Sequence, residues 1–188
     1  MTPFDRFDLC LPYVLRQVCK DADNWSDLGN LSHAALDLGD TSMCGIIQRE
    51  YDNYRKAHGL QTVPVINCTR LEGVFIYRAS YWMPHCPNLL PGLDLLFFDT
   101  SAQMTESEAT KIMQHALGLP ETGLWGTTED MRVNASQQSG LLGLMADFIS
   151  RRRDGYKNLS GFSVLGDLWL KRAGEIGDQA VAMAQAGG

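Results

Sequence analysis

The sequence predicts a mainly α-helical protein. Apolar residues recur at spacings of three and four through residues 4–18, the pattern of an amphipathic helix. Thr105 and Glu108 form a capping-box sequence, which is typical of a helix start. The alternation typical of strands is limited to the short segments 62–66 and 124–125. These observations favour helices as the bulk of the fold.

The helical segments can be assigned in chain order from periodicity and from residues that begin or end helices. Residues 20–40 are rich in Asp, Asn, Ser and Gly and predict a loop region. Gly118 is a natural residue to follow the end of the helix that starts at Thr105. We expect helices over residues 4–18, 41–58, 70–80, 93–102, 105–117, 139–155 and 161–184, with a short one around 32–36.

Length and composition limit the class of protein. The 188 residues are enough for one compact domain, or for one domain with a small helical appendage. A composition of 45% hydrophobic and 20% charged residues is that of an ordinary soluble globular protein. The net charge of −6 argues against a nucleic-acid partner, because phosphate contacts need a clustered basic surface.

Five cysteines, at positions 10, 19, 44, 68 and 86, leave two interpretations open. They are either buried thiols, or they form disulfides in an oxidising exterior and leave one thiol free or bonded to a neighbouring subunit. No Cys-x-x-Cys pair occurs and the four histidines are scattered, so we expect no metal site and no cofactor.

The first ten residues carry Asp5, Arg6 and Asp8, and lack both the basic and the apolar region of a signal peptide. No apolar run reaches the length of a membrane span, so no membrane partner is expected. We expect synthesis in the cytoplasm without a signal peptide. Action on a cell wall would then require release by lysis or incorporation into a particle.

A series of short motifs occurs in a fixed order along the chain. It begins with Leu-Pro-Tyr-Val-Leu at 11–15 and continues with Gly-Ile-Ile-Gln at 45–48, Tyr-Asp-x-Tyr-Arg at 51–55 and Leu-Pro-Gly-Leu-Asp at 90–94. In this order the motifs resemble those of the phage-type N-acetylmuramidases of glycoside hydrolase family 108. The resemblance implies a lysozyme-like helical domain over residues 1–118.

The C-terminal third resembles the small helical peptidoglycan-binding segment that usually follows that domain. The residues that carry this resemblance are Gly-Leu-Trp-Gly at 123–126, Arg152 with Tyr156, and Trp169 with Arg172. The resemblance therefore implies a second, helical segment over residues 119–188, packed on the first domain.

The chain departs from the family at the residue that carries the chemistry. The resemblance places Val18 where the family has its catalytic glutamate, and a valine cannot donate a proton to a glycosidic oxygen. About ten extra residues separate Val18 from Asp37 by this alignment. Asp21 and Asp23 are the fallback candidates for the acid.

Five residues are candidates for substrate binding: Trp25, Gln48, Tyr81, Trp82 and Gln103. The tryptophans and Tyr81 could stack on pyranose rings, although for Tyr81 and Trp82 a place in the core is the favoured interpretation. Gln48 belongs to a shared motif and Gln103 stands where the family has an asparagine. We expect Val18 at the floor of a cleft bordered by residues 20–40 and by the helix that carries Gln103.

Two buried acids are predicted to be structural. Asp94 and Asp99 lie in an apolar run, and we expect them to form buried ion pairs with Arg55 or Arg78.

The leading functional hypothesis is a catalytically degenerate muramidase-like protein of phage or prophage origin. It would be a structural or wall-docking component of a tail or baseplate, with other tail or baseplate proteins and peptidoglycan as partners. We expect an apolar patch around Trp25, Leu28, Leu31 and Leu36 to contact such a protein. The alternatives are an active endolysin or tail lysozyme that uses Asp21 or Asp23, and a secretion-linked wall remodeller of a bacterium.

Overall fold

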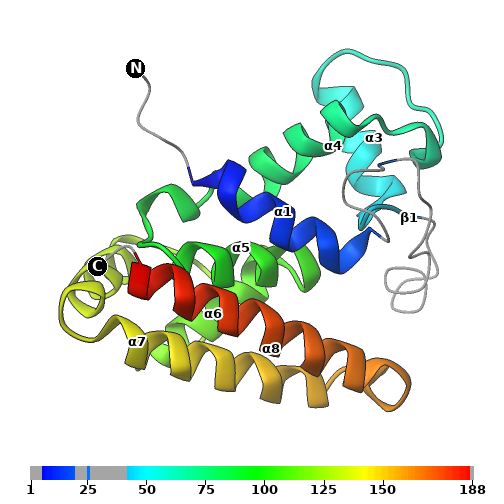
Figure 1. The fold of residues 1–188 in the computed structure, drawn as a ribbon. Helices are drawn as coiled ribbons and strands as arrows, with labels where there is room; N and C mark the ends of the chain where they lie inside the picture. The colour runs from blue at the N-terminus through cyan, green and yellow to red at the C-terminus, as the bar shows by residue number, and fades with distance from the viewer. Residues whose placement is uncertain (1–5, 20–24, 26–41, 187–188) are drawn as a thin grey trace. The chain divides into compact units, whose positions relative to one another are not determined.

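The computed structural model describes residues 6–19, 25 and 42–186, and these are mainly helical (Figure 1). The chain folds into two compact units. The N-terminal unit is Phe7–Met83, and the C-terminal unit is Pro84–Gly188 together with Met1–Arg6. The boundary at residue 118 that the resemblance suggests falls inside the C-terminal unit.

The N-terminal unit begins with helix α1 (Phe7–Val18), whose apolar spacing predicted it. Its buried residues recur every three or four positions and form one face of the helix. The remaining elements of this unit are β1 (Ser42–Met43), β2 (Ile46–Ile47), α3 (Gln48–Ala57), a 3₁₀ turn at Val65–Asn67, α4 (Arg70–Tyr77) and a π-helical turn at Arg78–Trp82.

The helix expected over 41–58 is wrong at its start. Residues 42–47 form an antiparallel hairpin in which Ser42 pairs with Ile47 and Met43 with Ile46. Its turn residues, Cys44 and Gly45, have φ angles of 47° and 81°, and an α-helix of L-residues excludes such angles. The chain becomes helical only at Gln48.

Helix α4 follows a complete capping box. The Thr69 hydroxyl accepts a hydrogen bond from the Glu72 amide at 3.3 Å, and the Glu72 carboxylate accepts one from the Thr69 amide at 3.0 Å. The helix expected over 70–80 is therefore present, although its pitch changes after Tyr77.

The C-terminal unit is built around α5 (Leu93–Gln103), which is buried along Leu93–Ser101. Around it lie a 3₁₀ turn at Cys86–Asn88, α6 (Glu106–Ala116), α7 (Thr127–Lys157) and α8 (Phe162–Ala186). Helices α7 and α8 pack along each other, and both contact α5 (Figure 1). Helix α5 is apolar at Leu93 and over Leu95–Phe98, and its buried Asp94 and Asp99 are paired with arginines.

The sequence predicted both ends of α6 correctly but placed the start of α7 too late in the chain. The Thr105 hydroxyl accepts a hydrogen bond from the Glu108 amide at 3.1 Å, and Gly118, with φ 66°, follows the end of α6 as predicted. Helix α7 begins at Thr127 and has a non-helical residue, Gly140, close to where the sequence predicted its start.

The two short strand predictions are wrong. Residues 62–66 and 124–125 are not strands, and several of their backbone groups bond to glutamine side chains instead. Gln48 bonds the Val63 carbonyl and the Val65 amide, and Gln114 bonds the Leu124 carbonyl. A short apolar run without a neighbouring strand has no ladder to join.

Within the part of the chain that the structure describes, none of the helices is both long and apolar enough to cross a membrane.

Candidate functional site

Val18 is the last residue of α1 and lies against the β1–β2 turn. A Cβ atom built on Gly45 would lie 3.2 Å from the Val18 Cβ and 2.9 Å from the Tyr77 hydroxyl. Gly45 therefore admits the close approach of α1 to the turn, and its φ of 81° also favours glycine. The side chains at this contact are an isopropyl group and a phenol, so neither supplies a carboxylic acid.

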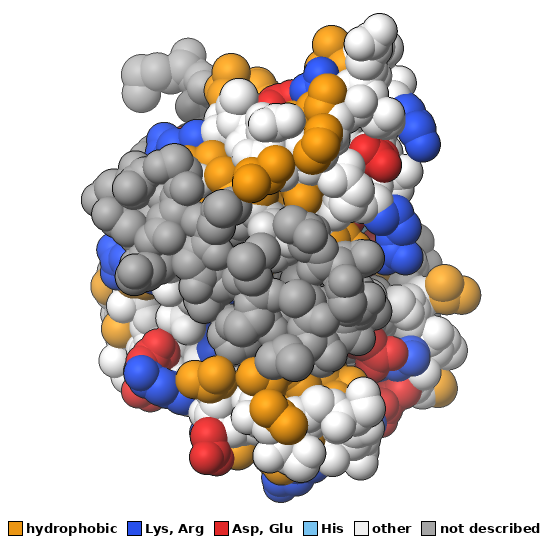
Figure 2. All heavy atoms as spheres, turned by 90° about the vertical axis from the view of Figure 1, so that its right-hand side faces the viewer, with side chains coloured by type: hydrophobic (Ala, Val, Ile, Leu, Met, Phe, Trp, Pro, Cys, Tyr) orange, Lys and Arg blue, Asp and Glu red, His pale blue; other side chains and the backbone are white. Residues whose placement is uncertain are grey.

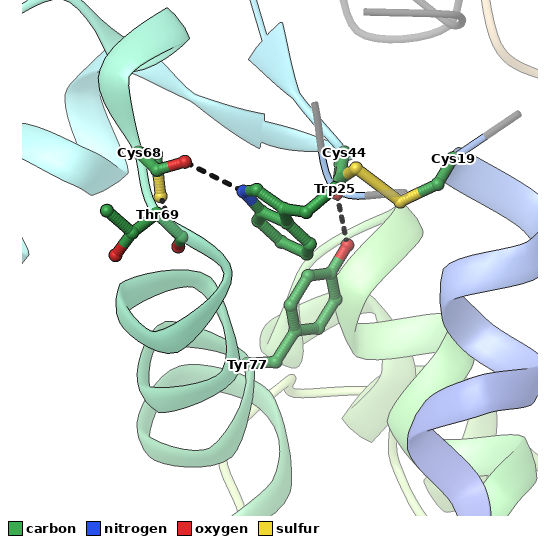
Figure 3. Close-up of a disulfide and its surroundings, with 6 residues drawn as sticks. All are labelled: Cys19, Trp25, Cys44, Cys68, Thr69 and Tyr77. Atoms are coloured by element: carbon green, nitrogen blue, oxygen red, sulfur yellow. Dashed lines mark hydrogen bonds between the residues drawn. A yellow bond between two sulfur atoms is a disulfide. The ribbon is translucent and has the colours of Figure 1, made fainter. Parts of the chain in front are cut away.

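A disulfide joins the same two segments. Cys19 follows α1 and is bonded to Cys44 in the hairpin turn, with their Cα atoms 4.8 Å apart (Figure 3). The Tyr77 hydroxyl donates a hydrogen bond to the Cys44 carbonyl at 2.8 Å (Figure 3). The end of α1 and the turn are thus held together by a covalent bond and by α4.

The structure combines the two interpretations of the cysteines. Cys19 and Cys44 form a disulfide, whereas Cys10, Cys68 and Cys86 are buried thiols.

Glu50 and Tyr81 form a second polar contact close to the hairpin. The Tyr81 hydroxyl donates to the Glu50 carboxylate at 2.5 Å, and the other carboxylate oxygen accepts from the Ile47 amide at 3.3 Å. Burial, together with the negative charge of Glu50, raises the pKa of Tyr81 well above its usual value. Tyr81 is therefore a neutral donor that orients Glu50, and its hydroxyl is already engaged within the unit.

Gln48 fixes the segment that follows α3. Its amide nitrogen donates to the Asp52 carboxylate and to the Val63 carbonyl, at 2.8 and 2.9 Å. Its amide oxygen accepts from the Val65 amide at 2.7 Å. Both ends of the side chain are thus engaged inside the protein, as expected of a structural residue.

Both tryptophans of this unit that were candidates for sugar stacking are buried. Trp25 is 7% exposed and donates from Nε1 to the Cys68 carbonyl at 2.7 Å (Figure 3). It lies so close to Gly73 that no side chain fits between them. Trp82 is 1% exposed and makes an edge contact with Phe7, with ring centroids 5.7 Å apart.

The burial of Trp25 also affects the apolar patch that was expected to contact a partner protein. Trp25 is packed into the unit, so the prediction that it faces a partner protein is wrong. Leu28, Leu31 and Leu36 lie outside the described residues, and so do Asp21 and Asp23.

Gln103 is part of a polar network in the C-terminal unit. Its side-chain oxygen accepts hydrogen bonds from Arg152, at 2.7 Å, and from the Tyr156 hydroxyl. Arg152 and Arg172 both bond the fully buried carboxylate of Asp99, at 2.5 and 2.7 Å. The predicted proximity of Gln103 to Val18 concerns residues of the two different units and stays a prediction.

Asp94 and Asp99 do form buried ion pairs, but the predicted partners are wrong. Asp94 pairs with Arg6 at 2.6 Å, and Asp99 pairs with Arg152 and Arg172. The predicted Arg55 instead pairs with Glu72 at 2.6 Å, between α3 and α4. Arg78 lies over the ring of Phe7, 5.0 Å from its centroid.

Two further features are the possible metal ligands and the distribution of charge among the described residues. Among residues 6–19, 25 and 42–186, no group of three His, Cys, Asp or Glu side chains could hold a metal ion. On the face shown in Figure 2, the described lysine and arginine side chains are interspersed with acidic ones.

These features define a mainly helical protein in which a disulfide joins a helix end to a hairpin turn, next to the residue at which the resemblance expects the catalytic acid. Residues 27–114 match the model of the family Glycosyl hydrolase 108. The resemblance found in the motifs is thereby confirmed for that segment. The match begins nine residues beyond Val18, so it leaves out the acid position.

A solved structure is similar over nearly the whole chain. The structure of Brucella abortus SagA matches with a TM-score of 0.77 and 21% sequence identity, and the match covers 95% of each chain. At this identity the likeness shows the fold, and the prediction of a mainly helical, lysozyme-like fold is confirmed. None of the curated proteins matches the sequence.

Proposed function

We propose that this protein is directed at the glycan strands of peptidoglycan. The support is the similarity of residues 27–114 to a glycosyl hydrolase family whose muramidases act on that polymer. The contact of α1 with the hairpin adds support, because the resemblance places the family's catalytic residue at this helix end.

Within this function, we propose that the chain binds glycan strands without cleaving them. The observation that carries this proposal is Val18, whose isopropyl group packs beside Gly45 where the resemblance expects a glutamate. Glycoside hydrolysis needs a protonated acid at the leaving oxygen, and a hydrocarbon side chain cannot supply the proton.

The second candidate is an active peptidoglycan hydrolase with Asp21 or Asp23 as the acid. The comparisons favour it, because the matched family is one of hydrolases. In the sequence, both aspartates lie between Cys19, which is bonded to Cys44, and the buried Trp25. An acid supplied from this stretch would replace the missing glutamate.

Purified peptidoglycan separates the two candidates. We expect the wild-type protein to co-sediment with it and to release no reducing sugar. Val18→Glu restores a carboxyl group at the acid position and should produce release, whereas the isosteric Val18→Gln should not. Release by the wild type that is lost in Asp21→Asn or Asp23→Asn would establish the second candidate. A wild type that neither binds nor cleaves would overturn the peptidoglycan proposal itself.

For the site of action, we propose a phage tail, a baseplate or the cell wall, with release from the cytoplasm at lysis. The support is the family resemblance alone. Mass spectrometry of purified phage particles from the source strain tests it, since a tail component is present at a fixed stoichiometry after density-gradient purification.

A further inference from the structure

The disulfide joins the end of α1 to the turn of a small, buried hairpin. The hairpin has two residues in each strand, and hairpins of this size are marginal without further packing. The Tyr77 hydroxyl donates a side-chain hydrogen bond to its turn. The bond from Cys19 adds a covalent restraint to this packing.

The backbone of Cys44 points to the same conclusion. Its φ of 47° lies in the left-handed region, which residues other than glycine, asparagine and aspartate rarely occupy. Asn-Gly is the preferred pair for a turn of this kind, and here a cysteine takes the first position. A cysteine there is unfavourable for the backbone alone, and the bond to Cys19 compensates.

We propose that the Cys19–Cys44 disulfide is a redox latch that closes the N-terminal unit only in an oxidising compartment. Reduced protein in the cytoplasm would lack the covalent link between the turn and α1 and would open more readily there, and oxidation would fix the turn beside Val18. The part of this inference that concerns binding rests on the proposed function, because the link to glycan strands comes from the resemblance, which places the family's catalytic residue at this end of α1.

The oxidation is a thiol–disulfide exchange with a disulfide-bearing oxidoreductase. One cysteine thiolate attacks a sulfur of the oxidant's disulfide and forms a mixed disulfide. The second thiolate attacks the protein sulfur of this intermediate and releases the oxidant as a dithiol. The chain loses two protons and two electrons, and the oxidant accepts two electrons and two protons as it becomes a dithiol.

Burial protects the disulfide of the latch from reduction once it has formed. Cys19 and Cys44 are 3% and 4% exposed, so a reductant has little access to the sulfurs once the unit has folded. The remaining thiols are poor attackers: burial raises the pKa of Cys68 to about 12, and Cys10 and Cys86 are fully buried. Exchange with the wrong cysteine is thereby disfavoured.

The first test counts thiols and measures local opening in the full chain. Protein folded in an oxidising buffer and then denatured should expose three alkylatable thiols, rising to five after reduction. In Cys19→Ser/Cys44→Asn, amide exchange at Met43 and Ile46 should quicken by about tenfold or more, because asparagine keeps the turn but not the bond. Cys68→Ala, which removes a thiol outside the latch, should leave their exchange unchanged.

Peptidoglycan co-sedimentation then tests the function of the latch. Oxidised wild type and Cys68→Ala should bind, and binding should fall about tenfold in the double variant and in wild type refolded with dithiothreitol. Should the double variant not fold by circular dichroism, the refolded wild type supplies the comparison. Five thiols without reduction, unchanged exchange, or equal binding by open and closed forms would overturn the latch. Faster exchange with no binding by any form would instead remove the proposed function and leave the structural role of the disulfide intact.

Discussion

Trp25 and Gly73 show how one residue fixes another across the N-terminal unit. A Cβ on Gly73 would lie 2.2 Å from Trp25 Cζ2 and 2.3 Å from Cη2, and real Cβ atoms do not approach so closely. The indole nitrogen bonds the Cys68 carbonyl next to α4, so the ring cannot simply move aside. Trp25 is therefore fixed against the start of α4.

We predict that Gly73→Ala destabilises the protein by about 1–3 kcal/mol, the usual cost of overpacking a core. Thermal unfolding followed by tryptophan fluorescence measures it. Gly143→Ala is the matched control, because Gly143 is exposed within α7 and has nothing within 4 Å of an added Cβ. That change should stabilise slightly, since alanine is the better helix former. Equal effects of the two substitutions would contradict the packing argument.

At the scale of elements, side chains replace missing backbone partners. Gln48 takes the place of a neighbouring strand for Val63 and Val65, and Gln114 does the same for Gly123 and Leu124. Each glutamine lies on a helix and holds the segment that follows it. The backbone of these segments is thus held by the side-chain amides of glutamines and not by pairing with another strand.

We predict that Gln48→Ala speeds amide hydrogen exchange at Val65 and lowers the free energy of unfolding by about 1–3 kcal/mol. The Val65 amide loses its acceptor in a buried setting, and an unsatisfied buried donor carries a penalty of that size. Exchange monitored by NMR measures the effect. Amides of α8 in the other unit are the internal reference, and Val65 protection equal to wild type would exclude this role for Gln48.

The helices were largely predictable because each has a local cause in the sequence. Periodicity marks α1, and Thr105 and Gly118 mark the ends of α6. The hairpin was not predictable from the sequence, because two-residue strands show no alternation and the turn depends on a cysteine at positive φ. The strand predictions failed for a related reason, since the competing glutamines come from other helices.

The candidate site was predictable in part. The motif order located Val18 at a helix end, which the structure shows. Five cysteines allow many pairings, so spacing could not select Cys19 with Cys44. The partners of Asp99 lie 53 and 73 residues along the chain, beyond the range of any local pattern.

At the scale of the whole molecule, a buried charge cluster organises the C-terminal unit. Asp99 on α5 bonds Arg152 on α7 and Arg172 on α8, so one carboxylate holds three helices. Tyr156, Arg152, Trp169 and Arg172, which carry the resemblance to a peptidoglycan-binding segment, are all buried. These four residues therefore match that segment through the core of the unit and not through an exposed binding surface.

We predict that Asp99→Asn destabilises the protein by about 3–5 kcal/mol, because it leaves two guanidinium groups buried without a counter-charge. Urea unfolding at neutral pH measures it. Asp154→Asn is the matched control, because its pair with Lys157 is exposed and screened by solvent. A loss no larger than that of the control would show that the arginines find other acceptors.

The same cluster sets a pH dependence with a defined sign. Burial acts to raise the pKa of Asp99, but the charges of Arg172 and Arg152 outweigh it, and the pKa lies below its usual value. The folded state therefore holds the proton less tightly than the unfolded chain, where aspartate titrates near about 3.9. The stability contributed by Asp99 is fully present above that pH and is lost as the pH falls through it toward the folded pKa.

We therefore predict that the wild-type unfolding free energy falls between about pH 4.5 and pH 2.5, and that Asp99→Asn shows a shallower fall because it has no proton to bind at this site. Urea titrations at half-unit pH steps, with Asp154→Asn measured in parallel, give the slopes. Because the carboxylate binds up to one more proton when unfolded, the difference in slope between wild type and Asp99→Asn reports this group directly. Parallel curves for the two proteins would mean that Asp99 keeps an ordinary pKa and that the arginines do not hold it charged.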